Sequence, residues 1–220
     1  MDTQLLKYLQ SYLTERRKTL FDTIIKNRTR HFTVVTEDVY QLHNTSAVMR
    51  TCDVFGIQDL HIVEENLGKR IDKEIAMGAQ KWVSLYRYAS IDDSISHLKD
   101  KGYRIIATTP HHKAYTLQDF DVSHPAAFFF GKESEGLSDT VINEADEFLT
   151  IPMFGFTESL NISVSVAIIL QTVMSRLHES AIDWQLTREE QRKIILDWTK
   201  NSIKSVDKII ERYYENKIKN

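Results

Sequence analysis

The sequence predicts an α/β protein with a mainly parallel β-sheet covered by helices on both faces. Short β-rich runs alternate with helical segments in the middle of the chain, as parallel strands joined by crossover helices do. The run 126–130 is apolar throughout, as in a strand buried on both faces. With 220 residues, the chain is long enough for one such domain with extensions but short for two independent domains.

Six strands and four helices are expected within this domain. The strands are expected at 32–36, 60–64, 82–88, 104–108, 126–130 and 147–151. The helices are expected at 44–55, 91–101, 138–145 and 159–179, with Gly102 closing the second. The helix at 159–179 is apolar nearly all round in its first half, which predicts burial on several sides. A partner subunit is an expected part of that cover, so the sequence favours a homodimer.

Both ends of the chain are expected to be helical. Leu5, Leu9 and Leu13 recur at every fourth residue, which predicts one helix over 3–26. The chain from Leu186 onwards is amphipathic again. We therefore expect a domain at 31–180 with helical extensions at 1–30 and 181–220.

The net charge of −3 is unevenly distributed along the chain. Residues 1–31 hold seven Lys and Arg against three Asp and Glu, and residues 187–220 hold nine against six. The middle therefore carries a net charge of −10. Basic ends around an acidic core fit an enzyme that binds a polyanion at its periphery. Solvated amphipathic helices fit the same charges, and charge alone leaves both interpretations open.

Cysteine content and hydropathy indicate a cytoplasmic protein. The single cysteine, Cys52, cannot form an internal disulfide and fits a reducing compartment. The apolar runs are too short for a membrane span, and the N-terminus lacks the pattern of a signal peptide. Neither a paired CxxC nor an HxxxH occurs, so no metal site is expected.

Two common nucleotide-binding motifs are missing. The seven glycines include no GxG, which excludes the dinucleotide fingerprint and its relative in common Rossmann methyltransferases. The run from Gly131 to Ser138 begins like a P-loop, but Leu137 occupies the position of the phosphate-binding lysine.

Three stretches place polar residues at the ends of predicted strands, where open α/β sheets bind ligands. They are HNTSAVMRTCD at 43–53, FFFGKESEG at 128–136 and IPMFGFTESLNISVSV at 151–166. Asn44 is suited to capping a helix, and Arg50 presents a planar guanidinium suited to phosphate. A simple cap and an ion-paired surface arginine are the alternatives. Ser159 and Asn161 open the long apolar helix, and capping accounts for only one of them.

Together these stretches resemble the three motifs of the SpoU/TrmH family of SPOUT methyltransferases. The matching patterns are N-x-S-A-x-x-R-T, F-G-x-E-x-x-G and I-P-M-x-G-x-x-x-S-L-N-x-S-V-x-x-A. The resemblance covers about residues 30–180. The basic helix before the first motif and the helical tail after the third resemble the TrmH-type tRNA methyltransferases. Thr157 and Glu158 depart from the family's more apolar or amide-bearing pair, but neither is a residue assigned to the chemistry.

The resemblance implies a fold and a cofactor. Its fold ends in a deep C-terminal trefoil knot, which nothing in the sequence pattern itself indicates. Its cofactor is S-adenosyl-L-methionine (SAM), the methyl donor. The positions that match its SAM-binding residues are Thr108, Gly131, Ile151, Met153 and Leu160. Their main-chain and apolar contacts suit an adenine ring and a carbon chain.

The resemblance also assigns catalytic roles. Arg50 matches the catalytic arginine, but a guanidinium holds its proton too tightly to serve readily as a general base. We therefore expect Arg50 to fix an RNA phosphate and stabilise the developing alkoxide, with direct proton abstraction left open. Asn44 is expected to hold the loop or the ribose, and Glu133 to orient the site. Ser159 and Asn161 are expected to position the target and the knot loop.

The implied reaction is methyl transfer to a ribose 2′-OH of RNA, with guanosine 18 in the D-loop of tRNA as the expected target. Arg16, Arg17 and Lys18 are the expected tRNA contacts. Ribosomal RNA or another tRNA position is an alternative, although residues 1–31 are short for the N-terminal domain that the rRNA enzymes often carry. A non-catalytic RNA-binding or assembly protein is the alternative of another class. The intact set of Asn44, Arg50 and Asn161 argues against it.

Overall fold

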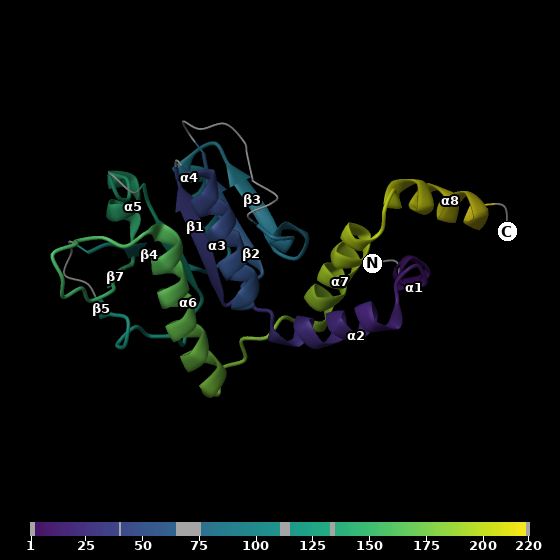
Figure 1. The fold of residues 1–220 in the computed structure, drawn as a ribbon, viewed down its shortest axis with the longest axis horizontal. Coiled ribbons are helices and arrows are strands. Elements are labelled where there is room, and N and C mark those ends of the chain that lie inside the picture. Colours follow the sequence, from purple (N-terminus) through teal and green to yellow (C-terminus); the bar gives the residue numbers. More distant parts are fainter. Residues whose placement is uncertain (1–2, 40, 65–75, 111–114, 133–134, 219–220) are drawn as a thin grey trace. The chain divides into compact units, whose positions relative to one another are not determined.

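The computed structural model describes residues 3–39, 41–64, 76–110, 115–132 and 135–218 (Figure 1). The chain divides into two compact units. We call Thr29–Trp184 the sheet unit, and Met1–Arg28 together with Gln185–Asn220 the terminal unit. None of the described helices combines the length and the hydropathy needed to span a membrane.

A seven-stranded sheet, parallel at every junction, forms the centre of the sheet unit. In chain order the strands are β1 (Phe32–Glu37), β2 (Asp59–Val63), β3 (Ser84–Tyr88), β4 (Arg104–Thr108), β5 (Tyr115–Thr116), β6 (Ala126–Phe130) and β7 (Glu147–Thr150). Their spatial order is β3-β2-β1-β6-β4-β7-β5. The six predicted strands are confirmed to within two residues at each end. The two-residue strand β5 was not predicted, because a run that short has no periodicity to detect.

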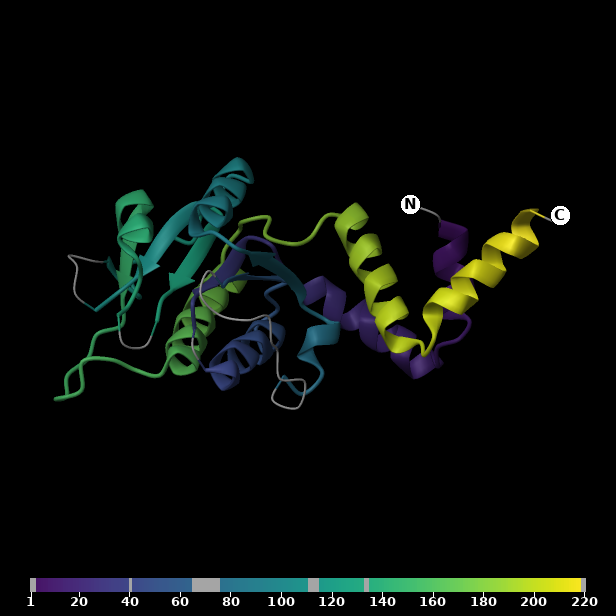
Figure 2. The same ribbon diagram turned by 90° about the horizontal axis from the view of Figure 1, so that it is seen from above.

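Helices cover both faces of this sheet, as predicted. They are α3 (Leu42–Val54), the 3₁₀ turn η2 (Ala79–Lys81), α4 (Ile91–Asp100), α5 (Asp139–Glu144) and α6 (Ile162–Glu179). Figure 2 shows α3 and α6 against one face and α4 and α5 against the other. The sheet unit therefore has three layers, with the sheet between two layers of helices.

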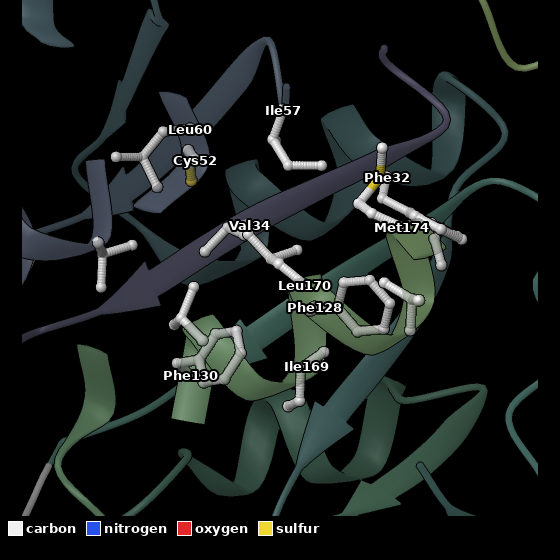
Figure 3. Packing of buried hydrophobic residues seen from close by; sticks show 14 of the residues in the cluster. Phe32, Val34, Cys52, Ile57, Leu60, Phe128, Phe130, Ile169, Leu170 and Met174 are labelled. Atoms are coloured by element: carbon white, nitrogen blue, oxygen red, sulfur yellow. The ribbon is translucent and has the colours of Figure 1, made fainter. Parts of the chain in front are cut away.

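Successive side chains along each strand point to opposite faces of the sheet, so the buried residues form two clusters, one on each face. Phe32, Phe128 and Phe130 point toward α3 and α6, where Figure 3 shows them packed with residues of α6 such as Leu170. Phe129 points the opposite way, into the cluster below α4 and α5. A buried aromatic side chain of this size stabilises a fold by about 1.5–3 kcal/mol. The three consecutive phenylalanines at 128–130 thus let one strand, β6, contribute to the core on both faces of the sheet.

Helix α6 starts later and is less completely buried than its sequence predicts. Asn161 is its N-cap, with Asn161 Oδ1 accepting from the backbone N–H of Ser163 at 2.9 Å, so Ser159 lies outside the helix. One side of α6 is buried, as Val166 and Leu170 show. Val164 remains 44% exposed and Ile168 36% exposed on another side. The single chain therefore covers one side of α6 and leaves the side of Val164 and Ile168 open, where the cover expected from a partner subunit would lie.

The helix predicted over 3–26 is broken. The structure has α1 (Thr3–Gln10), α2 (Glu15–Ile24) and a 3₁₀ turn η1 (Ile25–Asn27) in its place. Thr14 caps α2, its side chain accepting from the backbone N–H of Arg17, while Ser11 Oγ donates to Tyr8 O at 2.7 Å. These two local hydrogen bonds compete with continuation of the helix. The repeat of leucines at every fourth residue continues across the break and conceals it.

The two ends of the chain, expected as separate extensions, share one core in the terminal unit. Its C-terminal part consists of α7 (Arg188–Ser202) and α8 (Val206–Ile218), and Thr187 and Glu190 form a capping box at the start of α7. Trp198 of α7 packs against Phe21 of α2 with ring centroids 5.4 Å apart. The guanidinium of Arg28 lies 5.4 Å from the centre of the Trp198 ring.

Candidate active site

A cavity of about 580 Å³ opens at the carboxyl ends of β4, β6 and β7. Its volume falls within the range of small-molecule sites. Strand ends supply part of its wall, and the segment 158–162 with the start of α6 supplies the rest. All five positions expected to bind the cofactor line this cavity: Thr108, Gly131, Ile151, Met153 and Leu160. The fold therefore brings together residues that are up to 52 positions apart in the chain.

Gly131 is required by the close approach of two backbone segments. The backbone groups of Lys132 and Gly136 form two hydrogen bonds of 2.9 Å each, which bring the loop after β6 back on itself. A Cβ at Gly131 would collide with the backbone of Gly136 and Leu137. On the neighbouring strand, Thr108 Oγ1 donates to the Phe129 carbonyl at 2.6 Å. Glu133, the expected orienting residue, lies outside the described residues.

The cavity wall combines apolar side chains with carboxylates. Leu149 and Ile169 are among its apolar residues. Lys132 pairs with Glu135 at 3.0 Å, and Asp139 and Glu158 add two further negative charges. Such a wall suits a ligand that has both an apolar part and a positive charge.

Glu158 was noted in the sequence only as a departure from the family pattern, without a role in the chemistry. The structure instead places it in the wall of the cavity. Its position within the third motif, between Met153 and Leu160, was the signal that could have identified it.

Asn44 and Asn161 join the first and third motifs. Asn161 Nδ2 donates to Asn44 Oδ1 at 3.1 Å, across 117 positions of sequence. Asn44 lies in the first turn of α3 and is only 4% exposed, while Gln41 occupies the cap position without a side-chain cap bond. The alternative interpretation of Asn44 as a simple cap is therefore wrong, because Gln41 holds the cap position and the Asn44 amide makes a tertiary contact. Asn161, in contrast, both caps α6 and holds Asn44.

Arg50 lies outside the cavity. It is exposed on α3 and lines a separate groove between α3 and α6, whose other walls include Phe55, Val164 and Ile168. Ser159, in contrast, lines the cavity. Within one chain the structure thus groups Ser159 with the expected cofactor residues and leaves Arg50 on α3, in the separate groove between α3 and α6.

Glu37 is a buried carboxylate that the sequence analysis missed. It ends β1, is 6% exposed, and its Oε2 accepts from the backbone N–H of Ser138 at 3.0 Å. Ser138 is the N-cap of α5, so Glu37 fixes the far end of the glycine loop that borders the cavity. A charged residue at the end of an apolar strand was the signal in the sequence.

The expected RNA contacts lie in the terminal unit. Arg16, Arg17 and Lys18 occupy the first turn of α2, where Lys18 pairs with Glu15 at 2.7 Å. Arg16 and Arg17 are exposed. Within the described part of the chain, no group of three or more His, Cys, Asp or Glu side chains is placed to hold a metal ion.

A parallel α/β sheet with a cavity at its strand ends, bordered by a glycine loop, is the arrangement in which open α/β proteins bind small molecules. Residues 31–171 match the SpoU rRNA Methylase family, and the chain belongs to that family.

Individual relatives agree with this assignment over most of the chain. The tRNA (guanosine(18)-2′-O)-methyltransferase of Borreliella burgdorferi is 34% identical over 208 residues, covering 93% of this chain and 95% of the relative. The TrmH/SpoU tRNA modifying enzyme of A. aeolicus is 28% identical, with a TM-score of 0.79 over 87% of this chain and 98% of that one. The fold is also shared by AviRb of Streptomyces viridochromogenes in complex with AdoMet, at 20% identity and a TM-score of 0.63 over 71% of this chain and 64% of that one.

Proposed function

We propose that this protein transfers a methyl group from SAM to the ribose 2′-OH of guanosine 18 in tRNA. The cavity carries this proposal, because all five expected cofactor positions line it. The chain also matches 95% of the length of a relative named for this reaction. That similarity favours a tRNA substrate over ribosomal RNA. We further propose that the protein acts in the cytoplasm, where tRNA and SAM are both present.

SAM fits the cavity by its chemistry. When bound, it supplies a methyl group on a positively charged sulfur, with S-adenosylhomocysteine as the leaving group. The apolar residues Ile151, Met153 and Leu160 suit its adenine ring and carbon chain. The carboxylates of Asp139 and Glu158 suit its positive charge.

The catalytic roles are assigned from the charge and the hydrogen bonds that each side chain can supply. Arg50 positions an RNA phosphate and stabilises negative charge on the 2′ oxygen as the 2′-OH proton passes to solvent water, with direct proton abstraction by Arg50 as the alternative. Asn44 and Asn161 hold the start of α3 against the start of α6 through their hydrogen bond. Ser159 at the cavity wall positions the target ribose, and Glu133 orients the site.

The proposed active form is a homodimer that buries the groove beside Arg50. Val164 and Ile168 are exposed on the same side of α6 that lines this groove, and Leu160 nearby is 39% exposed. Apolar side chains gathered on one surface favour association with a second copy. A two-fold contact through α3 and α6 would bring a partner's site next to Arg50, which the single chain leaves apart from its own cavity.

The trefoil knot is also proposed. Strand β7 lies between β4 and β5, two strands that precede it in the chain. After β7 the chain passes through 151–161 and returns in α6, which packs on α3. Strand β6 also lies between two earlier strands, β1 and β4, so the strand order alone does not require a knot, and the proposal of a knot rests on the family resemblance.

Methyl transfer from tritiated SAM to unmodified tRNA tests the proposed function. We expect label at the 2′ oxygen of guanosine 18, located by nuclease mapping. Label at another tRNA position or in ribosomal RNA would support the alternative substrates. Label on a base would refute the reaction class, and binding of RNA without transfer would favour the non-catalytic alternative.

We predict that SAM binds without a metal ion and that Gly131→Ala weakens this binding. Calorimetry in the presence of EDTA should show binding at sub-millimolar SAM. The added methyl collides with the Gly136 backbone at a cost of about 1–3 kcal/mol in folding free energy, so the loop that borders the cavity must shift and should bind SAM more weakly. Gly155→Ala is the matched control, since a Cβ there meets its nearest neighbour, the backbone nitrogen of Thr157, at an ordinary 3.9 Å. Equal weakening by both variants would contradict the prediction.

Replacing Arg16, Arg17 and Lys18 with Ala should weaken tRNA binding and spare SAM binding. Each lost phosphate contact lowers the slope of log Kd against log salt concentration by about 0.9. The slope is measured by filter binding between low and moderate salt. Lys99→Ala/Lys101→Ala, which removes charges beside α4 in the sheet unit, is the control. An unchanged slope in the triple variant would remove these residues from the tRNA interface.

A further inference from the structure

Four of the nine tyrosines of the chain form a continuous row in the terminal unit. The rings of Tyr8 on α1 and Tyr213 on α8 lie 5.0 Å apart between centroids. Tyr12, just after α1, packs edge-on against Tyr8 at 5.5 Å, and Tyr214 packs edge-on against Tyr213 at 5.2 Å. Figure 2 shows α1 and α8 side by side. We call Tyr12, Tyr8, Tyr213 and Tyr214 the tyrosine row.

The row is a surface feature. Tyr12 is 47% exposed and Tyr214 is 43% exposed, and the two inner rings are half-buried. The hydroxyls of Tyr8 and Tyr12 lie 2.9 Å apart and form a hydrogen bond. The inner pair therefore fixes the row in place, while the outer pair presents ring area to solvent.

Positive charge lies beside the row. Lys217 Nζ is 5.8 Å from the centre of the Tyr213 ring. Arg212 directly precedes Tyr213 on α8, and its charge opposes the rise in the pKa of Tyr8 that the hydrogen bond with Tyr12 causes. The acidic residues of α8, at 207, 211 and 215, follow a four-residue spacing and form one stripe. Each residue of an α-helix is rotated by about 100° from the one before it, so this acidic stripe lies on the side of α8 opposite Tyr213. Tyr214 lies at the edge of the stripe.

The positive net charge of the whole terminal unit favours binding of a polyanion. It holds fifteen basic and nine acidic residues, a net charge of +6. The sheet unit holds thirteen basic and twenty-two acidic residues, a net charge of −9. A strongly negative ligand is therefore attracted to the terminal unit and repelled by the sheet unit.

We propose that the tyrosine row is a stacking platform for unpaired bases of the tRNA substrate. Aromatic rings beside basic side chains are the combination that binds single-stranded RNA, because bases stack on the rings while the cations neutralise phosphates. Tyr12 and Tyr214 take the bases, and Lys217 and Arg212 lie near the backbone. The inference rests on the proposed function, which supplies the RNA, and assigns a contact distinct from the charged first turn of α2.

The double variant Tyr12→Ala/Tyr214→Ala tests the platform in the full-length protein. Loss of a stacked base weakens binding of unmodified tRNA by about 5- to 150-fold. Tyr12→Phe/Tyr214→Phe keeps both rings and should bind as the wild type does. Leu20→Ala/Ile24→Ala removes exposed apolar side chains of the same unit, 45% and 37% exposed, and should also bind normally. Circular dichroism and SAM binding establish that each variant is folded.

Salt dependence separates stacking from electrostatics. The double Ala variant should raise Kd at every salt concentration with the slope of log Kd unchanged, since no phosphate contact is lost. Tyr12→Leu/Tyr214→Leu keeps apolar bulk without a ring face and should bind as weakly as the Ala variant. Wild-type affinity in the Leu or the Ala variant, or a changed slope, would overturn the platform. If wild-type protein itself neither binds nor methylates tRNA, the proposed function fails instead.

Discussion

Arg50→Ala should reduce methyl transfer to tRNA by more than about 10²- to 10³-fold while SAM binding stays nearly unchanged. Removing one donor that stabilises developing negative charge typically has an effect of that size. Arg50 is expected to hold the phosphate as well, so the loss should be larger. SAM binding is spared because Arg50 lines a groove separate from the cavity. Single-turnover transfer of tritiated methyl measures the first effect, and calorimetry the second.

Two further variants make the result on Arg50 specific. Arg50→Lys keeps the charge but loses the planar fork that matches a phosphate, so it should restore little activity. Lys101→Ala removes an exposed charge just after α4, on the opposite face of the sheet, and should leave turnover unchanged. Near wild-type turnover in Arg50→Ala would exclude this residue from the mechanism.

Ile168→Glu should convert a dimer into a monomer and abolish methyl transfer. Ile168 is 36% exposed on α6 and lines the groove that also contains Arg50. An unpaired carboxylate buried in an apolar interface costs about 3–5 kcal/mol, which raises the dimer Kd by more than 10²-fold. Light scattering at micromolar concentration measures the change in mass. SAM binding should persist, since Ile162, Ser165 and Ile169 line the cavity from another side of the same helix.

The control for this variant is Leu20→Glu. Leu20 is 45% exposed in the terminal unit, and a glutamate there should leave the mass unchanged. A wild-type protein that is already a monomer at micromolar concentration would contradict the proposed dimer. A dimer that survives Ile168→Glu would place the contact on a different surface.

The sheet and most of the site could be predicted from sequence because their signals are local. A buried strand such as Ala126–Phe130 shows itself in five consecutive residues. The cofactor positions, from Thr108 to Leu160, lie at or just beyond the ends of such strands, and parallel strands bring their carboxyl ends to one edge. The cavity therefore follows from strand order together with the family resemblance.

Contacts between distant segments could not be predicted in the same way. Asn44 reads as a cap in sequence, because its partner Asn161 is 117 positions away. The break after Gln10 depends on side chains such as Ser11 and Thr14, whose hydrogen bonds the leucine spacing does not report. Glu158 has no assigned role in sequence, and only the fold shows that it lies in the cavity wall.

By itself, the sequence determined the order of strands and helices along the chain and the residues that match the family's motifs. Only the tertiary structure decided that the two basic ends form one unit, that the tyrosines of α1 and α8 meet, and that Arg50 faces a groove apart from the cofactor cavity. Periodicity reports which side of an element is apolar, because neighbouring residues share one backbone geometry. It does not report which other element that side meets, because that choice depends on packing over the whole chain.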